Sequence, residues 1–108
     1  MKDGADTMEN ATNMKKDHKK SLVADDVEHI CYLCGGTAVH EHHIFGGPCR
    51  KASDRHRLVV HLCLACHMKV HDKGGPEMQY LHRIGQQAYE EHIGSRQQFI
   101  AEFIRNYL

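Results

Sequence analysis

Two C-x-x-C pairs are the strongest chemical pattern in the sequence. Cys31 and Cys34 form the first pair and, after residues 35–62, Cys63 and Cys66 form the second. A C-x-x-C turn lets two thiolates converge on one soft cation, and two such pairs give the closed tetrahedral coordination of a structural zinc ion. Free core cysteines and a redox-active pair are the alternatives, but a βαβ pattern around the pairs, typical of thioredoxin-like motifs, is missing. The spacing therefore predicts structural Zn2+, while Cys49 is interpreted as an unpaired loop thiol.

Four histidines form a second pattern around the cysteines. His42 and His43 are adjacent on an expected strand, so their side chains point to opposite faces. His67 and His71 are four residues apart on a helix expected over 66–73, a spacing that places two imidazoles where they can chelate one ion. One of the adjacent pair can therefore join a metal site while the other acts as a base, a division that suits phosphodiester hydrolysis. The other histidines are interpreted as ordinary surface or core residues: His18, His29, His40, His56, His61, His82 and His92.

A basic cluster lies between the two expected strands. It contains Arg50, Lys51, Arg55 and Arg57, and we expect it to form a loop that can lie along a phosphate backbone. An ordinary solvated loop is the alternative. Because aromatic residues are not interleaved with these cations, a platform for stacking single-stranded bases is not expected. Recognition of the backbone, with low or structure-directed specificity, is favoured.

The pattern along the chain predicts a flexible, disordered tail over 1–26 and a single domain over 27–108. A metal-binding core is expected over 27–75, with strands near 39–44 and 58–62. Two packing helices are expected over 76–108. The first ends near Gly94, and the second is capped by Ser95 with Gln98 as its capping-box partner. The apolar face of this last helix comprises Phe99, Ile100, Phe103, Ile104 and Tyr107, and it is also a candidate contact for a homodimer.

Length and composition limit the classes of protein. A chain of 108 residues allows one small α+β domain, and 41% hydrophobic with 6% aromatic residues makes a core that usually needs a staple. The 14 basic and 14 acidic side chains exclude a histone-like polycation and give no polybasic membrane signal. Neither a secretory signal nor a membrane-spanning run is visible, so a cytoplasmic location is expected.

Three segments together resemble the HNH (ββα-metal, His-Me finger) endonucleases in their four-cysteine form. The segments are CYLCG at 31–35, EHHI at 41–44 and LCLACH at 62–67, with His71 one turn later. The resemblance covers about residues 28–73. The C-terminal helices are also similar to those of small phage and prophage recombination-enhancement nucleases.

The resemblance implies a fold, an activity and partners. The fold would be a zinc-stapled, treble-clef-like ββα-metal module in which the four cysteines bind structural zinc. The activity would be metal-dependent hydrolysis of DNA in a bacterial or phage-infected cell. His42 would be a metal ligand, His43 the general base that activates water, and His67 and His71 the remaining ligands. Mg2+, Mn2+, Ni2+ or Zn2+ would be the catalytic ion, and a recombinase filament or another phage protein would be a partner.

The sequence departs from the family at one position. The central Asn or His that orients the base in many members is replaced by Leu58, so His56 or a backbone carbonyl would have to orient His43. Glu41 or Asp72 could add an acidic ligand to the metal site. The alternative function is a non-catalytic zinc-finger module that binds nucleic acid, and a third is a redox sensor built on the C-x-x-C pairs.

Overall fold

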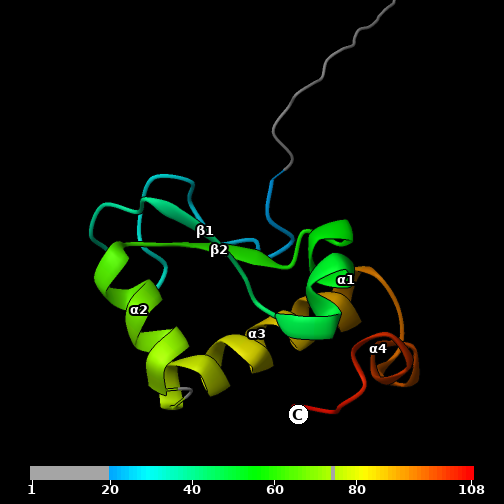
Figure 1. Cartoon of the computed structure of the whole chain (residues 1–108). Coiled ribbons are helices and arrows are strands. Elements are labelled where there is room, and N and C mark those ends of the chain that lie inside the picture. The colour runs from blue at the N-terminus through cyan, green and yellow to red at the C-terminus, as the bar shows by residue number, and fades with distance from the viewer. Residues whose placement is uncertain (1–19, 74) are drawn as a thin grey trace, which may run out of the picture.

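The computed structural model describes residues 20–73 and 75–108, which form a two-stranded sheet surrounded by helices (Figure 1). The mixed α+β class is therefore confirmed. The last two helices, α3 and α4, follow the sheet-bearing part of the chain as expected. The elements in chain order are β1 (His40–His43), the 3-10 helix η1 (Gly47–Cys49), α1 (Arg50–Arg55), β2 (Val59–Leu62), α2 (Leu64–Lys73), α3 (Pro76–His92) and α4 (Arg96–Phe103).

The two strands pair as an antiparallel hairpin close to the positions expected for them. His42 lies opposite Val60, and His43 lies opposite Val59. Side chains alternate between the faces of a strand. His42 is therefore on the buried face that α2 covers, whereas His43 is on the other face, half-buried.

The connection between the strands is helical, which corrects the expectation of a basic loop at 50–57. Gly47 begins η1, Pro48 lies in its first turn, and η1 leads directly into α1, which is about one and a half turns long. Ser53 is completely buried, and its hydroxyl donates to the carbonyl of Leu58 at 2.7 Å and accepts from the amide of Phe45 at 3.3 Å. These bonds fix α1 across the open end of the hairpin. Six residues are too few for a readable helical period, so the sequence gave no sign of this helix.

Packing of the domain begins before residue 27. Residues 1–19 of the expected tail lie outside the described residues, but Val23 is buried and Asp26 binds β2. The two carboxylate oxygens of Asp26 contact His61, one accepting from its backbone amide at 2.8 Å and the other lying 2.6 Å from its ring Nδ1. His61 was expected to be an ordinary residue. Its role in the structure is to hold residues 20–26 against the hairpin.

The core lies between the hairpin and the C-terminal helices. Phe45 contacts Phe99 and Phe103 of α4, and all three are buried. The expected capping box of Ser95 and Gln98 is confirmed. The apolar face is shorter than expected, because α4 ends at Phe103 and Ile104 is exposed with φ of 77°. Since the aromatic residues of α4 pack within the chain, the homodimer stays a prediction.

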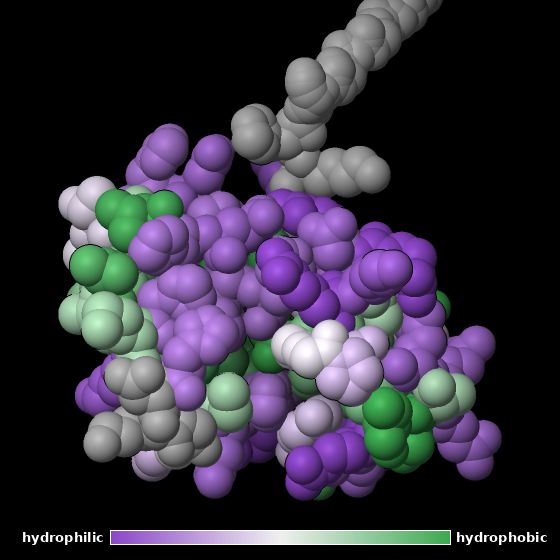
Figure 2. Space-filling view, in the orientation of Figure 1, coloured by the Kyte–Doolittle hydropathy of each residue, from purple (hydrophilic) through white to green (hydrophobic). Residues whose placement is uncertain are grey.

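The molecular surface is largely polar on the face drawn in Figure 2, with hydrophobic residues in small separate groups near its edges. None of the helices in the described part of the chain combines the length and apolar character needed to cross a membrane.

Candidate functional site

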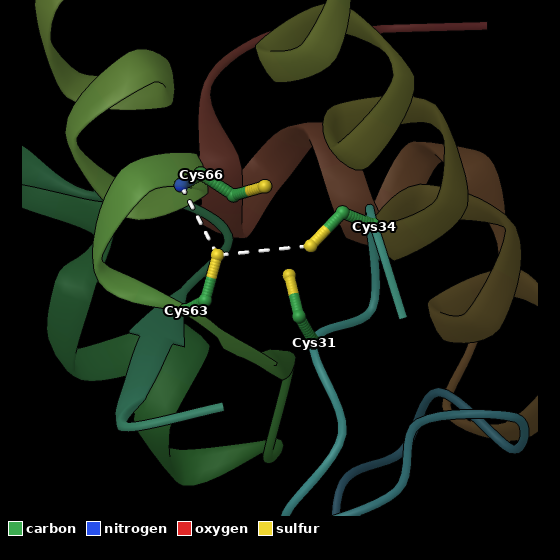
Figure 3. A group of neighbouring side chains, drawn as sticks. All are labelled: Cys31, Cys34, Cys63 and Cys66. Carbon is green, nitrogen blue, oxygen red and sulfur yellow. Dashed lines mark hydrogen bonds between the residues drawn. The ribbon is translucent and has the colours of Figure 1, made fainter. Parts of the chain in front are cut away.

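The four cysteines of the C-x-x-C pairs come together at one end of the hairpin. Their sulfur atoms all lie within 4.8 Å of one another, and Cys34 Sγ is 3.7 Å from Cys63 Sγ. Figure 3 shows Cys31 and Cys34 approaching from the segment before β1, while Cys63 and Cys66 approach from the start of α2. All are free thiols. Four converging sulfurs without an open position suit a structural zinc site.

Local backbone geometry explains why the sulfurs converge. Gly35 has φ of 81°, a conformation that favours glycine, and its amide donates to the carbonyl of Cys31 at 2.9 Å to close the turn. The amide of Gly36 then donates to Cys34 Sγ, and the amide of Cys66 donates to Cys63 Sγ, each at 3.4 Å. Both C-x-x-C segments thus offer N–H groups to thiolates, which stabilises the charged form that binds a cation.

The thiols interact strongly enough to titrate unequally. Burial raises the pKa of Cys31, but amides of Cys63, Cys34 and Leu33 outweigh it and lower that pKa to about 6. Burial, followed by the neighbouring sulfurs, raises the pKa of Cys66. One thiolate therefore forms readily, and its negative charge opposes ionisation of the other thiols. A divalent cation would neutralise this negative charge, and its binding would release protons from the remaining thiols.

Three imidazoles form a second cluster on the α2 face of the hairpin. The cluster contains His42 from β1 with His67 and His71 from α2, and its ligand nitrogens lie within 4.8 Å of one another. Nε2 of His67 and Nε2 of His71 are 3.0 Å apart. Because the two residues are one helical turn apart, their imidazoles both point at His42, which is only 5% exposed. The structure thus brings together the three histidines that the sequence selected as metal ligands.

Burial favours the neutral form of two of these imidazoles. Desolvation, with smaller contributions from His67 and His71, lowers the pKa of His42 to about 4. Desolvation, followed by His71 and His40, also lowers the pKa of His67. A neutral imidazole has the free lone pair that a metal ligand needs, so His42 and His67 suit a divalent cation at pH 7.

His40 belongs to the surroundings of this cluster, although it was expected to be an ordinary residue. Its Nδ1 lies 3.0 Å from Nδ1 of His67, and their ring centroids are 4.9 Å apart. A contact to the second ring nitrogen fixes the orientation of a ligating histidine. The spacing in the sequence could have predicted this position, since His40 precedes His42 by two residues on a strand and so shares its face.

His43 lies on the other face of the hairpin, in a network of charged groups. Its Nε2 is 3.2 Å from Oδ1 of Asp54, which α1 carries. Arg57 contacts the same Asp54 oxygen at 3.4 Å and also pairs with Glu41. Glu41, His43 and Asp54 could also hold a cation together, but the guanidinium of Arg57 already supplies positive charge to both carboxylates. The network is therefore better suited to orienting His43.

Asp54 was not recognised as an orienting residue from the sequence. His56, which was expected to be able to substitute for the missing central Asn, instead places its Nε2 2.7 Å from Glu102 and packs edge-on against Tyr89. Leu58 is completely buried in the core. Glu41 faces Arg57 rather than the imidazole cluster, and the side chain of Asp72 lies outside the described part of the structure.

The basic cluster divides into two parts. Arg50, Lys51 and Arg55 share a groove of about 480 Å³ with His43 and Asp54. Arg55 also bonds Glu102 at 3.0 Å, but its side chain remains 58% exposed. Arg57 does not line this groove, because it turns toward Glu41 with only 19% of its side chain exposed. The groove thus places three cations beside His43, and Arg57 supports the network instead.

Comparison of the chain with models of protein families, with curated proteins and with solved structures gave no match. Function is therefore inferred from the residues and their geometry.

We expect zinc to be required for folding. Replacement of one ligand, Cys63→Ser, should abolish stoichiometric zinc binding and the cooperative thermal transition. Apparent binding energies of about 10–16 kcal/mol in zinc-finger peptides are comparable to the whole stability of a small domain. Metal analysis by atomic emission and circular dichroism melting measure the two effects.

Cys49→Ser is the matched control, since Cys49 is a half-buried thiol outside the cluster. It should keep its zinc and melt cooperatively. A Cys63→Ser protein that folds without zinc would show that the thiol cluster is not a structural metal site.

Proposed function

We propose that the chain is a metal-dependent endonuclease of the HNH type that hydrolyses phosphodiester bonds of DNA. One observation carries this proposal. Adjacent residues of β1 meet two different environments, since His42 joins His67 and His71 while His43 lies beside Asp54 and the basic groove. A metal-binding imidazole and an oriented base thus come from neighbouring residues, whose Cα atoms are about 3.8 Å apart.

Two metal ions with different roles follow from the two clusters. The four cysteines hold structural Zn2+, and His42, His67 and His71 hold the catalytic divalent ion. Three imidazoles favour Ni2+ or Zn2+, whereas Mg2+ and Mn2+ prefer oxygen ligands. Three protein ligands leave positions open for substrate and water.

His43 is the general base in this proposal. Its Nε2–H donates to Asp54, which leaves the lone pair of Nδ1 free to take a proton from water. The water oxygen then bonds to phosphorus, the bond from phosphorus to the leaving oxygen breaks, and solvent protonates that oxygen. When bound, the ion supplies positive charge for the phosphate and the leaving oxygen. Asp54 also stabilises His43 after it becomes positively charged.

The groove beside His43 is the proposed site for the DNA backbone. Arg50, Lys51 and Arg55 are all exposed and can contact phosphates next to the one that is cut. Contacts of this kind carry no base information, so the proposal favours low sequence specificity. A recombinase filament or another phage protein as a partner stays a prediction from the resemblance.

A zinc-finger module that binds nucleic acid without cutting it is the second candidate. Leu58 at the position of the orienting Asn favours it. This module would need the thiol cluster and the groove, but it would need neither the imidazole cluster nor the contact of His43 with Asp54. Binding of a second metal ion and hydrolysis therefore separate the two functions.

The imidazole cluster should bind one divalent ion in addition to zinc. His67→Ala removes one of three ligands, so the affinity of the protein for Ni2+ should fall by at least about 10-fold. Loss of a residue that only supports a metal ligand already costs about 10- to 100-fold, and loss of a ligand should cost no less. Titration calorimetry of the zinc-loaded protein with Ni2+ measures this affinity. His92→Ala is the control, because His92 is an exposed histidine outside the cluster. Equal Ni2+ affinity in both variants would contradict the imidazole site.

Loss of the base should stop cleavage without unfolding the protein. His43→Ala should slow nicking of supercoiled plasmid by about 100-fold or more, the usual contribution of a general base. The assay uses zinc-loaded protein with Mg2+, Mn2+, Ni2+ or EDTA, and His92→Ala again controls for the loss of a histidine. Nicking that His43→Ala retains in full would rule out His43 as the base. No nicking by the wild-type chain with any ion would favour the binding module.

Asp54 should act through His43. Asp54→Ala should lower kcat for plasmid nicking by about 10-fold or more, because His43 loses its acceptor, while Ni2+ affinity stays unchanged. Asp54→Asn should restore only part of kcat, since its amide oxygen can accept the same hydrogen bond but carries no negative charge to stabilise protonated His43. If both variants changed KM alone, Asp54 would instead serve substrate binding in the groove.

A further inference from the structure

A second hollow lies between α3 and the last residues of the chain, away from the groove beside His43. Its volume is about 450 Å³, within the range of ligand pockets. The residues that line it are Met78, Gln79, His82, Arg83, Arg105, Asn106 and Tyr107. None of these is acidic. In Figure 1 the C-terminal end of the chain runs back from α4 toward α3.

Two arginines share this hollow without a counter-charge. Arg83 comes from α3 and Arg105 from the C-terminal segment, and both are exposed. Among the described residues, neither makes an ion pair, whereas Arg55, Arg57 and Arg96 each pair with a carboxylate. Arg105 lies 5.4 Å from the ring centroid of Tyr107, which orients its guanidinium. The hollow therefore carries two guanidinium groups and no carboxylate.

Hydrogen bonds from α3 hold the C-terminal segment in place. Gln86 is completely buried, and its side chain donates to Oδ1 of Asn106 at 2.8 Å and accepts from the amide of Tyr107 at 2.6 Å. Ile104, just before Arg105, has φ of 77°, which is strained for a β-branched residue. Strain of this kind costs about 1–3 kcal/mol and persists where surrounding contacts fix the backbone, often at functional sites. These contacts therefore fix the backbone that places Arg105 at the hollow beside α3.

The hollow adjoins the end of β1 that carries the proposed active site. His82, one of its lining residues, stacks on Phe45, with ring centroids 5.3 Å apart and planes at 13°. Phe45 is the second residue after His43. Gly85 packs so closely there that an added Cβ would lie 2.8 Å from the Phe45 ring. Phe45 thus links the hollow through the core to the strand that carries His42 and His43.

We propose that this hollow, the Arg83–Arg105 pocket, binds a phosphate group of the nucleic-acid strand beyond the one that is cut. The inference rests on the proposed function and extends its substrate contacts to a second site. Guanidinium groups suit phosphate because their fork geometry matches two phosphate oxygens. The amides of Gln79 and Asn106 add polar groups that can bind the same ligand. The pocket lengthens the bound strand and adds affinity without reading bases.

The test measures binding of DNA at several salt concentrations. The full-length, zinc-loaded chain carries His43→Ala to prevent cleavage, and fluorescence anisotropy reports binding of a labelled duplex. Arg83→Gln and Arg105→Gln should each weaken binding and should each reduce the slope of log K against log salt by about 0.9, the value for one lost phosphate contact. Arg96→Gln is the matched control, because it removes one positive charge from a residue that is paired with Glu90.

The outcomes separate this inference from the proposed function. The proposed phosphate pocket is wrong if Arg83→Gln and Arg105→Gln give the same salt slope as Arg96→Gln. It is also wrong if the chain does not bind DNA. In a competition experiment, inorganic phosphate at millimolar concentration should displace the labelled duplex less well than an unlabelled oligonucleotide does. Equal competition by the two would show that the pocket binds free phosphate rather than a nucleic-acid strand. Hydrolysis of bis(p-nitrophenyl) phosphate by the chain with His43 intact tests the metal centre separately. If the chain does not hydrolyse this ester but the two arginine variants still change the salt slope, the proposed nuclease activity is wrong and the nucleic-acid-binding pocket stands.

Discussion

The convergence of four sulfurs is the constraint on which the rest of the site depends. It joins the turn at Cys31–Cys34 to the beginning of α2, and so sets where that helix starts relative to β1. His67 follows Cys66 directly, so the position of the thiol cluster decides whether the imidazole reaches His42. The hydrophobic core lies mainly against α3 and α4, and among the α2 side chains that the structure describes only Val70 is buried. Zinc would therefore hold α2 in place where hydrophobic packing is thin.

The alternation of side chains along β1 then gives two neighbouring histidines different chemistry. His42 is buried with other imidazoles, and desolvation lowers its pKa to about 4. His43 is on the polar face, where Asp54 contacts one of its nitrogens. A shift of one residue in the strand register would exchange these environments. Register is fixed from both sides, because Ser53 bonds to the backbone on either arm and Asp26 binds His61.

Features that depend on local spacing could be predicted from the sequence, and features that depend on contacts between distant residues could not. The two C-x-x-C pairs, the i, i+4 histidines, both strands and the capping box at Ser95 are each encoded within a few residues. Asp54 contacts His43 only because α1 folds across the hairpin, and α1 is too short to leave a period. His56 shows the opposite error, since its place in the sequence suggested a role beside His43 that its contact with Glu102 excludes. The end of α4 was missed because Ile104 continues the apolar pattern while its backbone leaves the helix.

A net charge of zero conceals an uneven distribution of paired and unpaired cations. Acidic residues lie beside the arginines that support structure, as Glu41 and Asp54 do for Arg57 and Glu90 does for Arg96. Within the described residues, Arg50, Lys51, Arg83 and Arg105 make no ion pair, and all four are exposed. They lie at two hollows that adjoin the same end of β1. At physiological salt, screening limits the electrostatic field of a surface charge to about 8–10 Å. The attraction of a polyanion therefore depends on these local groups rather than on the net charge of the chain. A net charge of zero is therefore compatible with the proposed binding of DNA, because the exposed, unpaired cations are concentrated at these two places.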